Sequence, residues 1–130
     1  MIVIETSAIV DALVGDPANP ALLELIAAED LHAPTLIDYE VASALRGHVL
    51  GGKLNSERMN EAVEDFVDLT IDRYQMSAMM ADVLALRDNY TVYDAAYVVL
   101  AHSLGAPLVT ADTKLVDVTD LGIDVRVFRP

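Results

Sequence analysis

The amino-acid sequence predicts an α/β domain, a three-layer α/β/α arrangement with a mainly parallel central sheet. Short apolar runs alternate with stretches of helical periodicity along the 130 residues, which is typical of helices that cover both faces of a sheet. The apolar runs are continuous, as expected for strands buried on both sides. Hydrophobic residues make up 54% of the chain, enough for a sizeable core. Because no repeat, linker or low-complexity stretch interrupts this pattern, we expect a single domain over residues 1–130.

The first half of the chain should begin on a buried strand. Thr6 or Ser7 is suited to cap the following helix, and Gly15 to end it. Pro34 suits the first turn of a longer helix, which Gly51 would end. The expected elements are a strand over residues 2–4, a helix over 8–14, a helix from Asp16-Pro17 to about 26, a strand over 31–33 and a helix over 34–50.

The second half continues the alternation. Ser77 and Thr91 are expected to cap helices, and Gly105 to terminate the second of them. The expected elements are a helix from about Asn55, a strand over 69–73, a helix from Ser77, a helix from Thr91, a strand over 107–110, a short helix after Asp112 and a last strand over 125–128.

The composition limits where the protein works. The sequence has no cysteine, which excludes disulfides and thiolate metal sites and fits a reducing, cytoplasmic environment. No apolar run approaches the roughly 18 residues of a membrane span. The net charge is −13, whereas proteins that bind nucleic acid usually carry a basic surface. The acidic residues either solvate the surface or converge on a divalent cation.

Two acidic residues directly follow predicted strands. Glu5 comes after the first strand, and Asp112 comes just after the strand that ends at Thr110. In parallel sheets, ligands bind outside the carboxyl ends of the strands, which is where both carboxylates would lie. Each residue also has a structural interpretation. Glu5 would favour the positive end of the following helix, and Asp112 could cap a short helix.

Two further acidic residues lie on apolar helix faces. Glu40 shares its face with Leu36 and Ala44, and Asp94 shares its face with Tyr97. A buried carboxylate must be paired, hydrogen-bonded, protonated or bound to a cation. Asp94 could instead complete a capping box, because it stands three residues after Thr91. For Glu40, which this prediction places in the middle of a helix, the structural alternative is an ion pair with Arg46 or Arg58.

Taken together, Glu5, Glu40, Asp94 and Asp112 suit a shared oxygen-ligand cluster. Such clusters hold Mg²⁺ or Mn²⁺, which need neither cysteine nor histidine. A bound metal of this kind positions a water nucleophile, lowers its pKa and stabilises charge on a phosphate oxygen. The reaction class that this chemistry predicts is phosphodiester hydrolysis.

Four stretches resemble the PIN-domain nucleases of the VapC toxin type, from toxin–antitoxin pairs. They are MIVIETSAIVDAL, LIDYEVASALRG, TVYDAAYVVLAHSLGAPLVTADTKL and DVRVF, and their order and spacing are similar to the family's from end to end. The third stretch is the most specific. The resemblance implies a Mg²⁺- or Mn²⁺-dependent endoribonuclease that forms homodimers and is inhibited by a small VapB-type antitoxin.

The resemblance also implies roles for single residues. Glu5, Glu40, Asp94 and Asp112 match the family's catalytic, metal-binding acids. Ser7 matches the small polar residue that follows the first acid, Thr110 the hydroxyl that supports the last, and Asp117 is a candidate outer acid. Arg46 and Tyr93 are candidate contacts for RNA or antitoxin.

One residue departs from the family's pattern. Glu5 stands where the family usually has aspartate, so its carboxylate is one methylene further from the backbone. This leaves an alternative function, a catalytically weakened PIN domain that acts mainly as an interaction partner of its antitoxin. A receiver-type phosphoacceptor domain fits less well, because Glu5 is alone after the first strand and Lys114 follows Asp112 within a helix.

Overall fold

A computed structural model describes residues 1–115 and 121–128 of the chain. Its centre is a sheet of five parallel strands in the order β3-β2-β1-β4-β5. The expectation of a mainly parallel sheet is confirmed. The elements are β1 (Ile2–Ile4), α1 (Thr6–Val14), α2 (Pro20–Ala28), β2 (Leu31–Pro34), α3 (Ile37–Leu50), α4 (Ser56–Asp68), β3 (Ile71–Tyr74), the 3-10 helix η1 (Ser77–Met79), α5 (Met80–Ala85), α6 (Val92–Leu104), β4 (Leu108–Thr110) and β5 (Val125–Val127).

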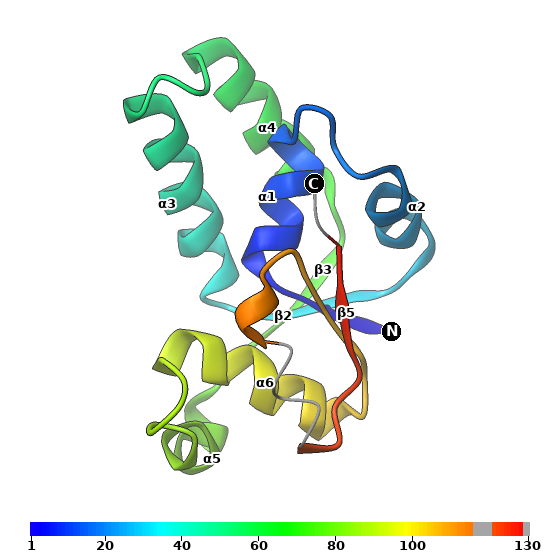
Figure 1. The fold of residues 1–130 in the computed structure, drawn as a ribbon, viewed down its shortest axis with the longest axis vertical. Coiled ribbons are helices and arrows are strands. Elements are labelled where there is room, and N and C mark those ends of the chain that lie inside the picture. The colour runs from blue at the N-terminus through cyan, green and yellow to red at the C-terminus, as the bar shows by residue number, and fades with distance from the viewer. Residues whose placement is uncertain (116–120, 129–130) are drawn as a thin grey trace.

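The helices form layers on the two sides of this sheet. Figure 1 shows α1, α2, α3 and α4 on one side and α5 and α6 on the other, with the strands between them. Helix α6 packs against β1 and β2, while α1 contacts β4 and the neighbouring helices α3 and α4. The three-layer α/β/α prediction is therefore confirmed.

Strand β1 lies in the middle of the sheet because it pairs on both sides. Ile2 lies opposite Leu31 of β2, and Ile4 lies opposite Val109 of β4. All three residues of β1 are buried, as their continuous apolar character predicts. The residue that follows β1 is therefore placed at the centre of the sheet's carboxyl edge.

Several helix boundaries lie where the sequence predicts them. The Asn55 side chain accepts a hydrogen bond from the Arg58 N–H at the start of α4, and Thr91 accepts one from Asp94 at the start of α6. Gly105 ends α6 with φ 62°, a left-handed conformation that suits a residue without a β-carbon. Gly51 ends α3 as predicted.

Several other predicted boundaries are wrong. Glu5, not Thr6 or Ser7, is the N-cap of α1. Pro34 belongs to β2, where it lies opposite Tyr74, so α3 begins only at Ile37 and Glu40 lies in its first turn rather than in its middle.

The strand predicted over 69–73 is displaced, because Leu69 is the C-cap of α4 and β3 runs over Ile71–Tyr74. Other differences concern capping residues. Asn19 caps α2, and the Asp16-Pro17 peptide precedes that helix in the cis form. Ser77 opens a 3-10 turn without a side-chain cap. After Asp112, residues 113–115 form a 3-10 turn, and the rest of the predicted short helix lies outside the described residues. Among the described residues, no helix combines the length and apolar character that a membrane crossing requires.

Candidate functional site

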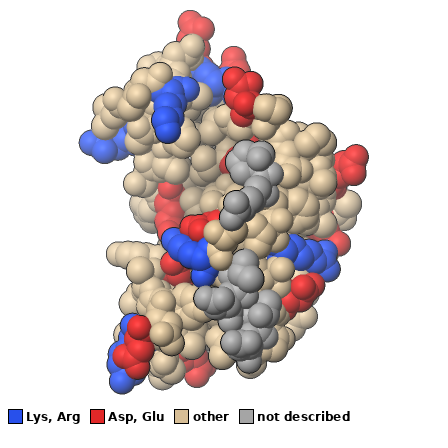
Figure 2. Space-filling model, viewed as in Figure 1, with Lys and Arg blue, Asp and Glu red and all other residues tan. Residues whose placement is uncertain are grey.

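The four predicted acids come from four different segments. Glu5 follows β1, Glu40 lies in the first turn of α3, Asp94 lies in the first turn of α6, and Asp112 follows β4. Figure 2 shows acidic side chains in the hollow where the beginnings of α3 and α6 approach one another, with a basic side chain beside them. Asp94 and Asp112 contact the same lysine, whereas Glu5 and Glu40 are held by separate hydroxyl groups.

Glu5 is a buried carboxylate that hydroxyl groups hold in place. Its Oε2 atom accepts hydrogen bonds from the Ser7 N–H at 3.0 Å, from the Ser7 hydroxyl, and from the Thr110 hydroxyl at 2.9 Å. The Ser7 N–H belongs to the first turn of α1, so Glu5 serves as both N-cap and strand-end acid. Burial raises the pKa of the Glu5 carboxyl; the Ser7 and Thr110 hydrogen bonds oppose this rise, and the charge of Glu40 adds to it.

Glu40 meets two hydroxyl groups from other helices. Its Oε1 atom accepts a hydrogen bond from Thr6 of α1 at 2.8 Å and one from Tyr97 of α6 at 2.6 Å. The Thr6 and Tyr97 oxygens lie 2.8 Å apart, so the three groups form a closed triangle. Burial raises the pKa of Tyr97, and its hydrogen bond to Glu40 raises it further, so Tyr97 stays a protonated donor. This triangle fixes the Glu40 carboxylate where three helices meet.

Asp94 and Asp112 share one cationic group. The Lys114 Nζ atom lies 3.2 Å from Asp94 Oδ2 and 3.3 Å from Asp112 Oδ2. Burial lowers the pKa of Lys114, but the contacts with the two carboxylates outweigh it, and the net shift is upward. Because Lys114 is therefore charged at neutral pH, it offsets part of the repulsion between Asp94 and Asp112.

Thr110 and Ser7 connect the ends of β1 and β4. The Thr110 hydroxyl donates to Glu5 and accepts the Asp112 N–H at 3.0 Å. The Ser7 hydroxyl accepts the Ala111 N–H at 2.9 Å and lies 3.1 Å from the Thr110 oxygen. These two hydroxyls fix the backbone that carries Asp112 relative to the Glu5 carboxylate.

A family model described as PIN domain matches residues 2–121 of the chain. The chain belongs to the PIN-domain family. The resemblance seen in the sequence is thus confirmed, and the match includes all four acids.

Relatives named as VapC ribonucleases resemble this PIN domain over most of its length. Ribonuclease VapC9 of Mycobacterium tuberculosis is 38% identical over 117 residues, which cover 90% of each chain. Ribonuclease VapC1 of the same species is 36% identical over 129 residues, 98% of this chain and 97% of the relative. Ribonuclease VapC3 of Pyrobaculum aerophilum is 37% identical over 94 residues, 69% of this chain and 72% of the relative.

The donor atoms of the PIN domain's acidic site suit a hydrated divalent ion. Within residues 1–115 and 121–128, no three carboxylate or imidazole groups converge as a ready-made metal cage. Mg²⁺ does not need one, because it keeps several waters and commonly binds one or two carboxylates together with substrate phosphates. Asp94 and Asp112 already direct an oxygen each at a single cationic atom, and every acidic donor here is an oxygen. The residues present therefore fit Mg²⁺ or Mn²⁺.

The structure shows only some of the capping and ion-pair roles that the sequence suggested for single acids. Thr91 accepts the Asp94 N–H as in a capping box, but the Asp94 carboxylate contacts Lys114. Asp112 Oδ1 accepts the Lys114 N–H at 3.0 Å, as a residue capping a short helix would, while its other oxygen contacts Lys114 Nζ. The hydrogen bonds to Glu40 come from hydroxyls and not from an arginine.

The remaining predicted residues lie at the surface or beyond the described part. Arg46 and Tyr93 are exposed, and Tyr93 directly precedes Asp94 at the start of α6. The supporting role predicted for Asp117 concerns a residue outside the described ranges.

Three residues of the site were not predicted from the sequence: Thr6, Tyr97 and Lys114. Tyr97 gave a usable signal, since it stands three residues after Asp94 on the same helix face. Thr6 and Lys114 gave none, because their contacts with Glu40 and Asp94 depend on how distant segments pack.

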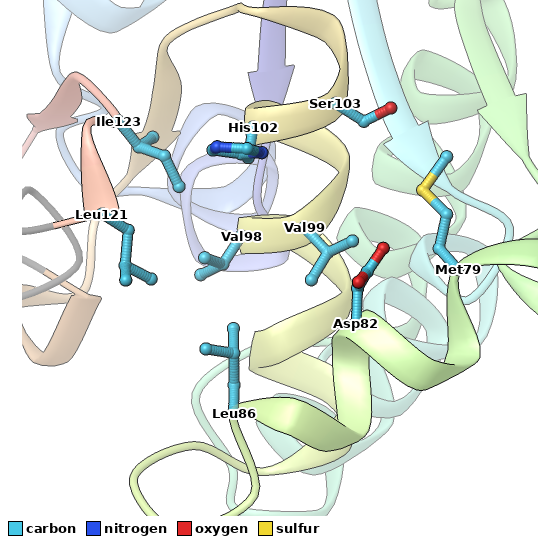
Figure 3. A pocket seen from close by; sticks show the side chains of 9 residues that line it. All are labelled: Met79, Asp82, Leu86, Val98, Val99, His102, Ser103, Leu121 and Ile123. Atoms are coloured by element: carbon cyan, nitrogen blue, oxygen red, sulfur yellow. The ribbon is translucent and has the colours of Figure 1, made fainter.

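A second hollow, of about 300 Å³, lies on the outer side of α6. Figure 3 shows Leu86, which follows α5, Val98 of α6 and Leu121 pointing into it, with His102 above them. None of the predicted site residues lines this hollow. The acidic site, where buried polar groups converge, is the better candidate for chemistry.

Proposed function

We propose that this PIN domain is the toxin of a type II toxin–antitoxin pair and a divalent-metal-dependent endoribonuclease. The observation that carries the proposal is that Asp94 and Asp112 each direct an oxygen at one cationic atom, Lys114 Nζ, while Thr110 connects the Asp112 backbone to the Glu5 carboxylate. The names of the VapC relatives, all ribonucleases, support RNA as the substrate. Hydrolysis adds a water oxygen to phosphorus and breaks one P–O bond to a ribose.

Mg²⁺, or Mn²⁺ in its place, would be held by Glu5, Glu40, Asp94 and Asp112. When bound, such an ion lowers the pKa of a coordinated water and offsets charge on a phosphate oxygen. The protein's own hydroxyls position the acids. Ser7 and Thr110 hold the Glu5 carboxylate, while Thr6 and Tyr97 hold that of Glu40. Productive geometry in such sites tolerates displacements of only about 0.5 Å, which is why these contacts matter.

The partners follow from the same proposal. With a net charge of −13, the protein repels a polyanion overall, so RNA contacts must be local. Arg46 and Tyr93 are exposed candidates for such contacts, with RNA or with a VapB-type antitoxin. We further propose a homodimer that acts in the cytoplasm.

A ribonuclease assay with the purified protein tests this function. We expect cleavage of a labelled single-stranded RNA with Mg²⁺ or Mn²⁺, none in EDTA, and a loss of at least about 100-fold in Asp94→Asn. Asp65→Asn is the matched control, because Asp65 is an exposed aspartate on α4, and it should keep wild-type activity. Cleavage that persists in EDTA, or equal activity in both variants, would contradict the proposal.

A further inference from the structure

Lys114 occupies a distinctive position among the basic residues. Its Nζ atom lies 3.2 Å from Asp94 Oδ2 and 3.3 Å from Asp112 Oδ2. The backbone N–H of Lys114 also donates a hydrogen bond to Asp112, to its Oδ1 atom at 3.0 Å. Both carboxylate oxygens of Asp112 therefore contact the same residue.

No other described lysine or arginine forms an ion pair with the four acids. Arg58 pairs with Glu61, Arg73 with Asp38, and Arg126 with Asp124. Two carboxylates that approach the same atom repel one another, and a cation between them offsets this repulsion. In the metal-free protein, the Lys114 ammonium supplies that charge.

We propose that Lys114 is an internal counter-cation that competes with the divalent ion for Asp94 and Asp112. The inference rests on the metal site of the proposed function. A divalent ion at these carboxylates must displace the ammonium, both because the two would share the same oxygens and because like charges repel. Metal affinity is therefore set partly by how easily Lys114 withdraws.

The side chain can withdraw. Lys114 is more than half exposed, and its flexible stem ends in an ammonium that water can solvate. Asp94, in contrast, is mostly buried. Lys114 is thus the residue that can move, whereas Asp94, which would bind the metal, is held in place.

Titration of the protein with Mn²⁺ alone, followed by calorimetry at constant pH, tests the competition. Removing the competing charge should tighten Mn²⁺ binding in Lys114→Met by about three- to tenfold, a range that allows for solvent screening of an exposed lysine. Lys114→Gln should behave in the same way, and Lys114→Arg should retain the weaker affinity of the wild type. Lys53→Met, which removes one exposed positive charge from the turn between α3 and α4, is the matched control for net charge and should change little.

A second readout separates this role from ordinary packing. In EDTA, Lys114→Met should unfold at a lower temperature than the wild type, because Asp94 and Asp112 then repel without a counter-charge. Saturating Mn²⁺ should raise its melting temperature more than that of the wild type, since ligand stabilisation grows with affinity.

The outcomes are distinguishable from a failure of the proposed function. If Lys114→Met binds Mn²⁺ no more tightly than the wild type, or if Lys53→Met tightens binding equally, the competition is overturned while the metal site stands. If none of these proteins binds Mn²⁺, both the competition and the proposed metal site are overturned.

Discussion

The Tyr97 hydroxyl lies 2.6 Å from Glu40 Oε1, and this hydrogen bond joins α6 to the first turn of α3. The two residues are 57 positions apart in sequence, and the Tyr97 side chain is fully buried. Together with the Thr6 hydroxyl, the buried Tyr97 hydroxyl thus holds an acid of the candidate site, and it connects helices from opposite layers of the domain.

Tyr97→Phe should therefore reduce stability by about 1.5–3 kcal/mol, the usual range for a hydrogen bond to a charged group. Urea unfolding measures the change. Tyr93→Phe is the control: it removes a hydroxyl from the same helix, but Tyr93 is 63% exposed, so its loss should cost less than about 0.5 kcal/mol. Equal stability of the two variants would show that the Tyr97–Glu40 contact does not hold in solution.

The buried Glu5 carboxyl should give stability a pH dependence. Burial, with the charge of Glu40, raises the pKa of Glu5 in the folded protein. Its contribution to folding stability is therefore full below the unfolded-state pKa and is lost as pH rises through the folded-state pKa. We expect Glu5→Gln to raise the melting temperature of the metal-free protein at pH 7. Near pH 4 the substitution should have little effect, because the Glu5 carboxyl is then protonated in about half or more of the molecules even in the unfolded state.

Glu64→Gln, an exposed change on α4, removes the same charge and is the control for this pH series. Melting curves of both variants in EDTA from pH 4 to pH 8 measure the difference. A Glu5→Gln effect that is the same at every pH would mean that the carboxyl is not destabilised by burial.

The length of the Glu5 side chain is also open to test. Oε2 receives hydrogen bonds from Ser7 and Thr110, so the longer carboxylate is anchored where it stands. Glu5→Asp shortens the side chain by one methylene and should weaken these contacts. We expect a lower melting temperature and no gain in RNA cleavage. A large gain from an inactive parent would instead support the alternative function, a weakened PIN domain that acts mainly through its antitoxin.

Two glycines make a matched pair for backbone packing. A β-carbon at Gly15 would lie 2.5 Å from the Asp11 carbonyl oxygen and 2.9 Å from the Ala18 Cα atom, whereas one at Gly47 meets nothing within 4 Å. Gly15→Ala should thus be destabilising by about 1–3 kcal/mol. Gly47→Ala, within α3, should stabilise the protein by about 0.5–1 kcal/mol. Thermal unfolding measures both changes. If Gly15→Ala leaves stability unchanged, the C-terminal end of α1 can shift to make room for the added β-carbon.

Much of the fold was predictable because its signals are local. The apolar run of β1 and the caps Asn55 and Thr91 act within a few residues of themselves. The beginning of α3 was not predictable from local signals. Pro34 suits a first helical turn, but its pairing opposite Tyr74 places it in β2. Tertiary pairing overrides local preference there.

The candidate site divides in the same way. Glu5 and Asp112 could be placed at strand ends from sequence alone, since parallel strands share a carboxyl edge. Lys114 could not be placed between Asp94 and Asp112, because that contact depends on how the chain after β4 approaches α6. Glu5 was not predicted as an N-cap because serine, threonine, aspartate and asparagine are the usual residues there.

The hydrogen bond between Thr110 and Glu5 spans 105 residues, nearly the whole chain. During translation, the Thr110 hydroxyl that holds the first acid, and the last acid, Asp112, are made more than 100 residues after Glu5. A nascent or prematurely terminated chain therefore lacks an assembled site. If the protein cleaves RNA, the ribosome and message that produce it are spared at least until Asp112 has been made.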